Sequence, residues 1–129
     1  MRKILSSAAL GLALILSLTA AVTHSAHAQD GSGVASKVML RGAPNGVKVA
    51  EIRIVRRSDV LVVEADLQNA DVKNHNVFYR FRWLDGSGMQ VGDGEAWKQL
   101  LVYGQQLAVV KSVAPTTATV DFRIEMNVE

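Results

Sequence analysis

Hydrophobic and polar residues alternate in short runs from Val47 to the end of the chain, and turn-forming residues separate the runs. A strand directs successive side chains to opposite faces, so such a run is typical of a strand with one buried face. Short strands at near-regular spacing predict an all-β sandwich or barrel. No part of this region keeps the helical period for three turns, so we expect no long helix. The predicted strands are residues 47–55, 60–68, 76–84, 89–91, 95–101, 106–113 and 119–127.

Two of these runs alternate most clearly and are predicted to be central strands. Their buried faces are expected to carry Val77, Tyr79, Phe81 and Trp83 in the first run and Val120, Phe122, Ile124 and Met126 in the second. The opposite faces are charged, and opposite charges on neighbouring strands attract. The expected cross-strand ion pairs join Arg80 or Arg82 to Asp121 or Glu125.

The first 28 residues have the pattern of a bacterial signal peptide. Arg2 and Lys3 form a basic start, an apolar run extends from about residue 8 to residue 22, and Ala26 and Ala28 fit a small-residue cleavage site. A retained membrane anchor is the alternative, because the apolar run, when extended back to Ile4, approaches the roughly 20 residues of a spanning helix. The polar residues Ser6, Ser7, Ser17 and Thr19 and the Ala-His-Ala ending favour cleavage after Ala28. We therefore expect export to the periplasm.

Removal of the signal leaves 101 residues, which is the size of one domain. Residues 29–46 are small, polar and rich in glycine, and predict a flexible linker with at most a short edge strand at residues 38–40. The β-sandwich domain is then expected at residues 47–129.

The net charge and the absence of cysteine argue against several classes of function. The formal charge of +2 disappears with Arg2 and Lys3, after which 12 basic residues face 12 acidic ones. A neutral domain gives no indication of nucleic-acid binding. The chain has no cysteine, so disulfides, thiolate metal sites and a lipid-modified cysteine are all excluded.

Residues capable of catalysis are few, and each has a simpler interpretation. His75 is the only histidine after residue 28, and a lone histidine in a polar loop cannot form an ordinary zinc site. Residues 85–88 (Asp-Gly-Ser-Gly) fit a hairpin turn rather than a serine-nucleophile elbow. Glu64 and Asp66 share a strand face and resemble a carboxylate pair, but a solvated face explains them equally well. We expect no catalytic residue, no metal and no cofactor.

Basic and aromatic residues give the better candidates for binding. Arg53 lies on one predicted strand, and Arg80 and Arg82 alternate with the exposed Phe78 on another, so these groups are candidates to meet on one sheet face. Guanidinium groups there would recognise carboxylates of a partner protein or of peptidoglycan stem peptides. Intramolecular ion pairs on the same face are the favoured alternative. Trp97 fills the core or forms an interface anchor, and core is the favoured position.

A series of residues resembles the YcfL family of bacterial envelope proteins. The series is Phe78-Tyr79-Arg80-Phe81-Arg82-Trp83-Leu84-Asp85, then Gly88, Trp97, Ala114-Pro115 and Asp121-Phe122-Arg123. The resemblance runs from about residue 49 to residue 126 and implies an immunoglobulin-like antiparallel β-sandwich of about seven strands in the periplasm, in a family of unknown function. Several relatives are lipoproteins, and some are encoded near activators of peptidoglycan synthesis. This chain departs from the lipoprotein pattern because it lacks the cysteine.

The sequence therefore predicts a non-catalytic periplasmic accessory or binding module. Its expected partner is an envelope protein or the peptidoglycan-synthesis machinery, contacted through a sheet face or an exposed edge strand. Contact with the membrane is expected only through an uncleaved signal. A domain that binds a cell-wall fragment or sugar is the alternative, and a hydrolase is the third possibility.

Overall fold

The computed structural model describes residues 31–129, so the predicted signal peptide lies outside the described residues. No helix within residues 31–129 is long and apolar enough to cross a membrane. The elements are a short helix α1 (Gly31–Lys37) and seven strands: β1 (Val38–Arg41), β2 (Val47–Arg57), β3 (Val60–Asn69), β4 (His75–Leu84), β5 (Lys98–Val102), β6 (Leu107–Val113) and β7 (Asp121–Val128).

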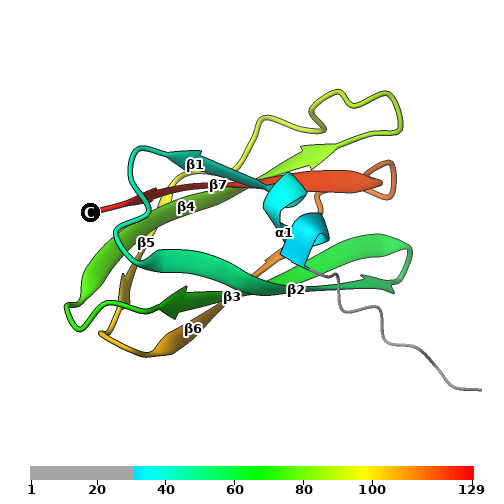
Figure 1. Cartoon of the computed structure of the whole chain (residues 1–129). Coiled ribbons are helices and arrows are strands. Elements are labelled where there is room, and N and C mark those ends of the chain that lie inside the picture. The colour runs from blue at the N-terminus through cyan, green and yellow to red at the C-terminus, as the bar shows by residue number, and fades with distance from the viewer. Residues whose placement is uncertain (1–30) are drawn as a thin grey trace, which may run out of the picture.

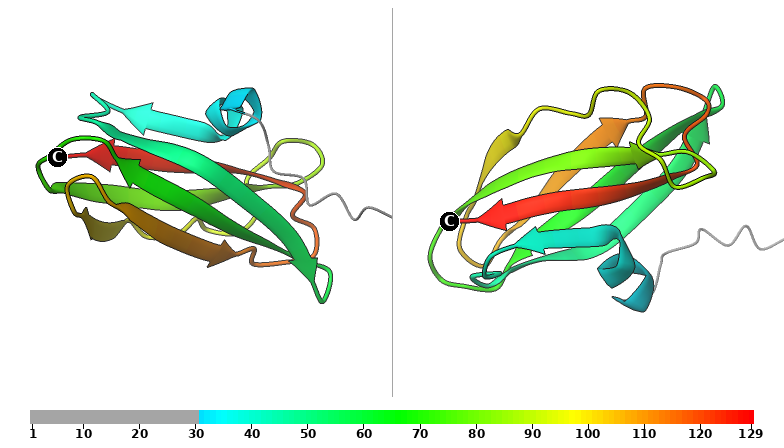
Figure 2. Two further views of the ribbon diagram at one scale, coloured as in Figure 1. Left: turned by 60° about the horizontal axis from the view of Figure 1, so that its bottom comes forward. Right: turned by 90° about the horizontal axis from the view of Figure 1, so that it is seen from above.

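The seven strands form two packed sheets, which confirms the predicted β-sandwich (Figure 1). One sheet has four strands in the order β1-β7-β4-β5, and the other has three in the order β2-β3-β6. Figure 2 shows the four-stranded sheet face on, with β1 in cyan beside β7 in red and β4 in green. A division into four and three strands is that of constant-type immunoglobulin sandwiches.

Alternating side chains of β4 and β7 form the centre of the core, as predicted. The two strands are antiparallel neighbours in the middle of the four-stranded sheet. Phe81 stacks on Trp83 with ring centroids 5.6 Å apart, and Phe122 lies 6.4 Å from Phe81. The facing sheet contributes fully buried Ile52 and Leu67 to the same cluster. Aromatic side chains of one sheet, packed against aliphatic side chains of the other, therefore supply the apolar burial on which a cysteine-free fold depends.

Three details of the strand prediction are wrong. Residues 89–91 form no strand, because only Gln90 makes a bridge to Leu84. The predicted strand at residues 95–101 begins instead at Lys98. Val120 precedes β7 and is 52% exposed, since the alternation of that strand starts only at Asp121.

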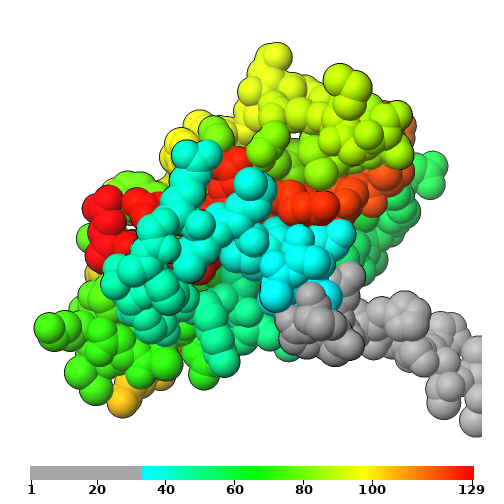
Figure 3. Space-filling model, turned by 45° about the horizontal axis from the view of Figure 1, so that its top comes forward, coloured from blue at the N-terminus to red at the C-terminus, as the bar shows by residue number. Residues whose placement is uncertain are grey.

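The segment predicted as a linker supplies two elements of the domain. Strand β1 pairs in parallel with β7, with Val38 opposite Ile124. Val34 of α1 is buried in the core cluster, and Lys37 forms a 2.6 Å ion pair with Asp121. Figure 3 shows α1 and β1, in cyan, lying against β7. The folded domain thus begins before residue 47, the boundary that the sequence predicts.

The turn that follows β4 is a hairpin-type turn, as predicted. The Asp85 carboxylate accepts hydrogen bonds from the backbone N–H groups of Ser87 and Met89, at 2.8 and 3.0 Å. Gly88 has φ +79°, a conformation that glycine adopts without the steric penalty of a Cβ. Backbone geometry therefore accounts for the Asp-Gly-Ser-Gly sequence.

Candidate binding site on the four-stranded sheet

Glu125 is a buried carboxylate on the outer face of the four-stranded sheet. Its neighbours β1 and β4 place guanidinium groups around it: Arg41 Nη2 and Arg80 Nε each donate to Glu125 Oε2 at 3.1 Å. Arg82 Nη1 lies 3.4 Å from Glu125 Oε1. The three arginines leave Glu125 only 1% exposed although it faces away from the core. Of the two carboxylates that the sequence offers to Arg80 and Arg82, both arginines pair with Glu125, whereas Asp121 pairs with Lys37 and Arg123. The sequence does not predict the full burial of Glu125.

Trp97 lies beside these arginines on the surface and is 39% exposed, so the favoured core position is wrong. The Arg80 guanidinium carbon is 4.6 Å from the centre of its ring, and that of Arg41 is 5.5 Å away. Both distances are within the range of cation–π attraction. Arg80 is therefore held by Glu125 on one side and by Trp97 on the other, which leaves it little freedom to reorient.

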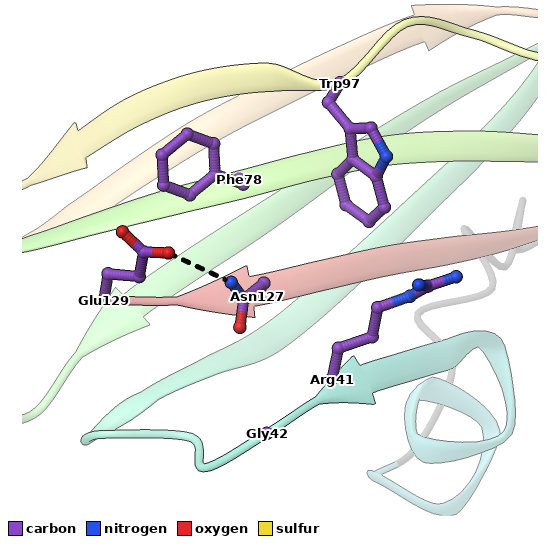
Figure 4. Close-up of a pocket in the computed structure, with 6 residues that line it drawn as sticks. All are labelled: Arg41, Gly42, Phe78, Trp97, Asn127 and Glu129. Atoms are coloured by element: carbon purple, nitrogen blue, oxygen red, sulfur yellow. Dashed lines mark hydrogen bonds between the residues drawn. The ribbon is translucent and has the colours of Figure 1, made fainter.

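A trough of about 490 Å³ opens next to this group. Phe78 and Trp97 line one side and Arg41 the other, and Asn127 and Glu129 lie between them (Figure 4). The Asn127 amide donates a long, 3.4 Å hydrogen bond to Glu129 Oε1. The trough thus has aromatic, cationic and amide groups drawn from β1, β4, β7 and the loop before β5. Gly42, which has no side chain, also lines the trough.

The outer face of this sheet has an excess of positive charge. Besides the three arginines around Glu125, it carries Arg123 opposite Arg82 in the strand register, and Lys37 beside Asp121. Arg123 also contacts Asp121, at 2.9 Å. Five cations therefore accompany three carboxylates, Asp121, Glu125 and the Glu129 of the trough, in a domain whose predicted mature charge is zero. We call Arg41, Arg80, Arg82, Trp97 and Glu125 the arginine cluster.

Arg53 does not join the arginine cluster, which corrects the expectation that these basic residues meet. It belongs to β2 in the three-stranded sheet, where it makes a 2.6 Å bond to Asp66 and 3.5 Å ion pairs with Glu51 and Glu64. The hydrogen bond from Arg53 holds the pKa of Asp66 below its ordinary value, although burial opposes this. The same bond raises the pKa of Arg53. Glu64 and Asp66 are therefore partners of an arginine rather than an unpaired carboxylate dyad.

His75 opens β4 instead of lying in the polar loop. Its Nε2 is 2.9 Å from Asp71 Oδ2, and its Nδ1 is 3.2 Å from the backbone oxygen of Glu129. Hydrogen bonding to His75 lowers the pKa of Asp71. Among residues 31–129, no hydroxyl group is hydrogen-bonded to His75, and no group of three or more His, Asp or Glu side chains is arranged to hold a metal ion.

The sequence pointed to Phe78, Arg80, Arg82 and Trp97, and the structure brings these four together. It missed Arg41, Asn127 and the burial of Glu125. Arg41 lies in the apparent linker, and only its pairing with a strand 84 residues later places it here. The sequence signal for Arg80, Arg82 and Glu125 is the series of charged residues at alternate positions of β4 and β7.

The fold is shared with solved structures of bacterial proteins. A crystal structure of Campylobacter jejuni cj0090 is 24% identical, covers 72% of this chain and 98% of its own, and superposes with a TM-score of 0.60. This likeness concerns the fold alone. A crystal structure of a DUF1425 family member from Shewanella sp. pv-4 is 26% identical, covers 64% of this chain and 76% of its own, and has a TM-score of 0.55.

The sequence model of one family matches residues 34–127, and its description is "Protein of unknown function (DUF1425)". No curated protein matches the chain significantly. The match includes all residues of the arginine cluster and all seven strands except Val128, the last residue of β7. The chain therefore belongs to the DUF1425 family.

Proposed function

We propose that this protein is a non-catalytic binding module of the bacterial envelope, and that it contacts a partner protein through the arginine cluster and the adjoining trough. The observation that carries the proposal is the arrangement of three guanidinium groups around one buried carboxylate beside the exposed Trp97. Tryptophan and arginine are the residue types that most often dominate protein interfaces. The excess of positive charge on this face supplies complementarity for an acidic partner.

Export to the periplasm is part of this proposal and rests on residues 1–28. A basic start, an apolar run and Ala26 and Ala28 at the cleavage site support it. Amino-terminal sequencing of the protein recovered from cells should give Gln29 as its first residue. Recovery of the uncleaved chain in the membrane fraction would instead support a retained anchor.

We also propose that, within the DUF1425 family, the chain is related to the YcfL proteins of the bacterial envelope. The residues that carry that resemblance include Phe78 and Trp97, two of the six residues that line the trough, and three of the five residues of the arginine cluster. Peptidoglycan-synthesis machinery is accordingly the class of envelope partner that we would examine first.

Binding of a sugar or cell-wall fragment is a second candidate, supported by two aromatic rings in one trough. Sugars bind by stacking on free aromatic faces, and Arg80 and Arg41 already lie over the Trp97 ring. Phe78 is half-buried and lacks a polar group of its own. The geometry therefore favours a protein partner.

Photo-crosslinking in living cells tests the proposal directly. A benzoyl-phenylalanine residue replaces Phe78 in the trough, and the matched control carries it at the exposed Tyr103, which does not line the trough. Both replacements substitute one aromatic ring for another. We expect a discrete adduct with an envelope protein from position 78 and a much weaker one from position 103.

Two results would count against the proposal. Equal adducts from both positions would indicate collisions rather than a site. A position-78 protein that folds, as judged by its urea-unfolding midpoint, and yet forms no adduct would exclude a protein partner at the trough.

A further inference from the structure

We infer that the trough binds a short acidic peptide segment in one polarity, with the acidic residue at Arg41, an apolar residue on Phe78 and Trp97, and a neutral or basic residue near Glu129. This inference rests on the proposed function, because it names the chemistry of the partner at the same site. Each of the three positions follows from a different part of the geometry.

The arginine cluster has more hydrogen-bond donors than its own carboxylate can use. A guanidinium group carries about five N–H donors, whereas one carboxylate accepts at about four lone-pair sites. Glu125 serves Arg41, Arg80 and Arg82 at once, through contacts of 3.1 to 3.4 Å. Donors and about two positive charges are therefore left for an external oxyanion.

Arg41 is the member of the cluster best placed to reach that oxyanion. Its side chain is 61% exposed, compared with 30% for Arg80, and it lines the trough itself. Arg80 donates to the buried Glu125 and stacks at 4.6 Å on Trp97, so it is a fixed support. Holding one guanidinium in place reduces the entropy lost when a ligand binds.

The remainder of the trough fits a peptide better than a small anion. Phe78 and Trp97 offer apolar surface beside the cation, and the Asn127 amide has both a donor and an acceptor to match a peptide group. A volume of about 490 Å³ is within the range of sites that enclose small ligands and far exceeds a phosphate ion.

Glu129 gives the trough a polarity. Its carboxylate lies beside Phe78 and Asn127, at the end of the trough opposite to the Arg41 guanidinium and Trp97 (Figure 4). A second acidic residue placed there would meet a like charge. The peptide is therefore expected to bind best with only one acidic end.

The test uses the protein purified from cells that express the full chain, and it titrates three capped hexapeptides. The first is Glu-Glu-Leu-Leu-Ser-Lys, the second replaces both glutamates by glutamine, and the third ends in glutamate instead of lysine. Trp97 fluorescence reports binding, and a Trp97→Phe variant, which keeps the buried Trp83, identifies the source of the signal. We expect the glutamine peptide to bind at least about tenfold more weakly than the first.

The matched variants are Arg41→Ala and Arg57→Ala. Both remove one exposed arginine, but Arg57 ends β2 in the other sheet. Loss of Arg41 should weaken the first peptide by about tenfold, whereas loss of Arg57 should leave its affinity unchanged. Equal affinity for the first and second peptides would overturn carboxylate recognition. Tightest binding of the third peptide would overturn the assigned polarity.

Inorganic phosphate and phosphatidylglycerol vesicles separate the other sources of an oxyanion. If inorganic phosphate binds as tightly as the first peptide and displaces it, the trough is a site for simple anions and not for an acidic peptide. If the protein binds the vesicles through Arg41 but does not bind the peptides, the ligand is a membrane surface and not an acidic peptide. If adducts form specifically at position 78 but no acidic peptide binds, the inference fails while the proposed function stands. If neither occurs, both fail.

Discussion

The two outer faces of the sandwich carry charge clusters of opposite composition. On the four-stranded sheet, one carboxylate, Glu125, is shared by three arginines. On the three-stranded sheet, one arginine, Arg53, is shared by Glu51, Glu64 and Asp66. The first cluster has an excess of about two positive charges and the second an excess of about two negative charges.

The difference lies in which group is buried. Glu125 is nearly inaccessible, so its cost of desolvation is offset only while the arginines surround it. Arg53 stays 40% exposed, and it makes its shortest contact with Asp66, the most buried of its three partners. One cluster is therefore built on a buried carboxylate surrounded by more exposed arginines, and the other on an exposed arginine. The first cluster adjoins a trough of about 490 Å³, whereas the pocket beside Arg53 in the second measures only about 90 Å³.

Removing the buried centre should have the largest effect on stability. In Glu125→Gln, three guanidinium groups lose their common acceptor, and we expect the free energy of unfolding to fall by about 2–3 kcal/mol. Urea unfolding measures this through the fluorescence of the buried Trp83. The control is Glu51→Gln, which removes an exposed carboxylate of the other cluster and should cost less than about 1 kcal/mol. Equal losses would show that burial does not distinguish the two clusters.

Removing the exposed centre should have a smaller but clear effect. Arg53→Ala leaves the buried Asp66 without its charged hydrogen-bond partner, and we expect a loss of about 1–2 kcal/mol. Arg57→Ala, on the same strand, controls for loss of an arginine. A neutral result for Arg53→Ala would mean that water replaces the guanidinium without penalty.

The second cluster should also contribute to acid sensitivity. Arg53 holds the pKa of Asp66 in the folded protein below its ordinary value near 3.8. The stabilisation from this carboxylate is therefore complete above pH about 4 and is lost as pH falls toward the depressed folded value. We expect the free energy of unfolding to fall less steeply below pH 4 in Asp66→Asn than in the unmodified protein. Parallel pH profiles would contradict this assignment.

Arg41→Ala should have the smallest effect on stability. Its side chain is mostly exposed and Arg80 and Arg82 still surround Glu125, so we expect a loss below about 1 kcal/mol. Such a result, together with the expected loss of peptide affinity, would separate a recognition residue from supporting residues. A loss as large as that of Glu125→Gln would make Arg41 part of the structural cluster instead.

Alternation along the chain predicted the sandwich, the buried faces of β4 and β7 and the pairing of Arg80 with Glu125. It could not predict that Arg53 lies on the other sheet, because a period of two assigns a face but not a sheet. The burial of Glu125 depends on Arg41, a residue 84 positions earlier, and the apparent linker around it carried no alternation. The surface position of Trp97 depends likewise on arginines from two other strands.

The parallel pairing of β1 with β7 has a consequence for the order of assembly. These are the first and last strands of the domain, and Arg41 and Asn127 occupy opposite positions in their register. A ribosome makes β7 last, so the trough is incomplete until nearly the whole domain has been synthesised. Any nascent or truncated chain lacking residues 121–128 has neither Glu125 nor a place for Arg41 to dock. The surface that we propose for binding thus forms only after β7 has been made.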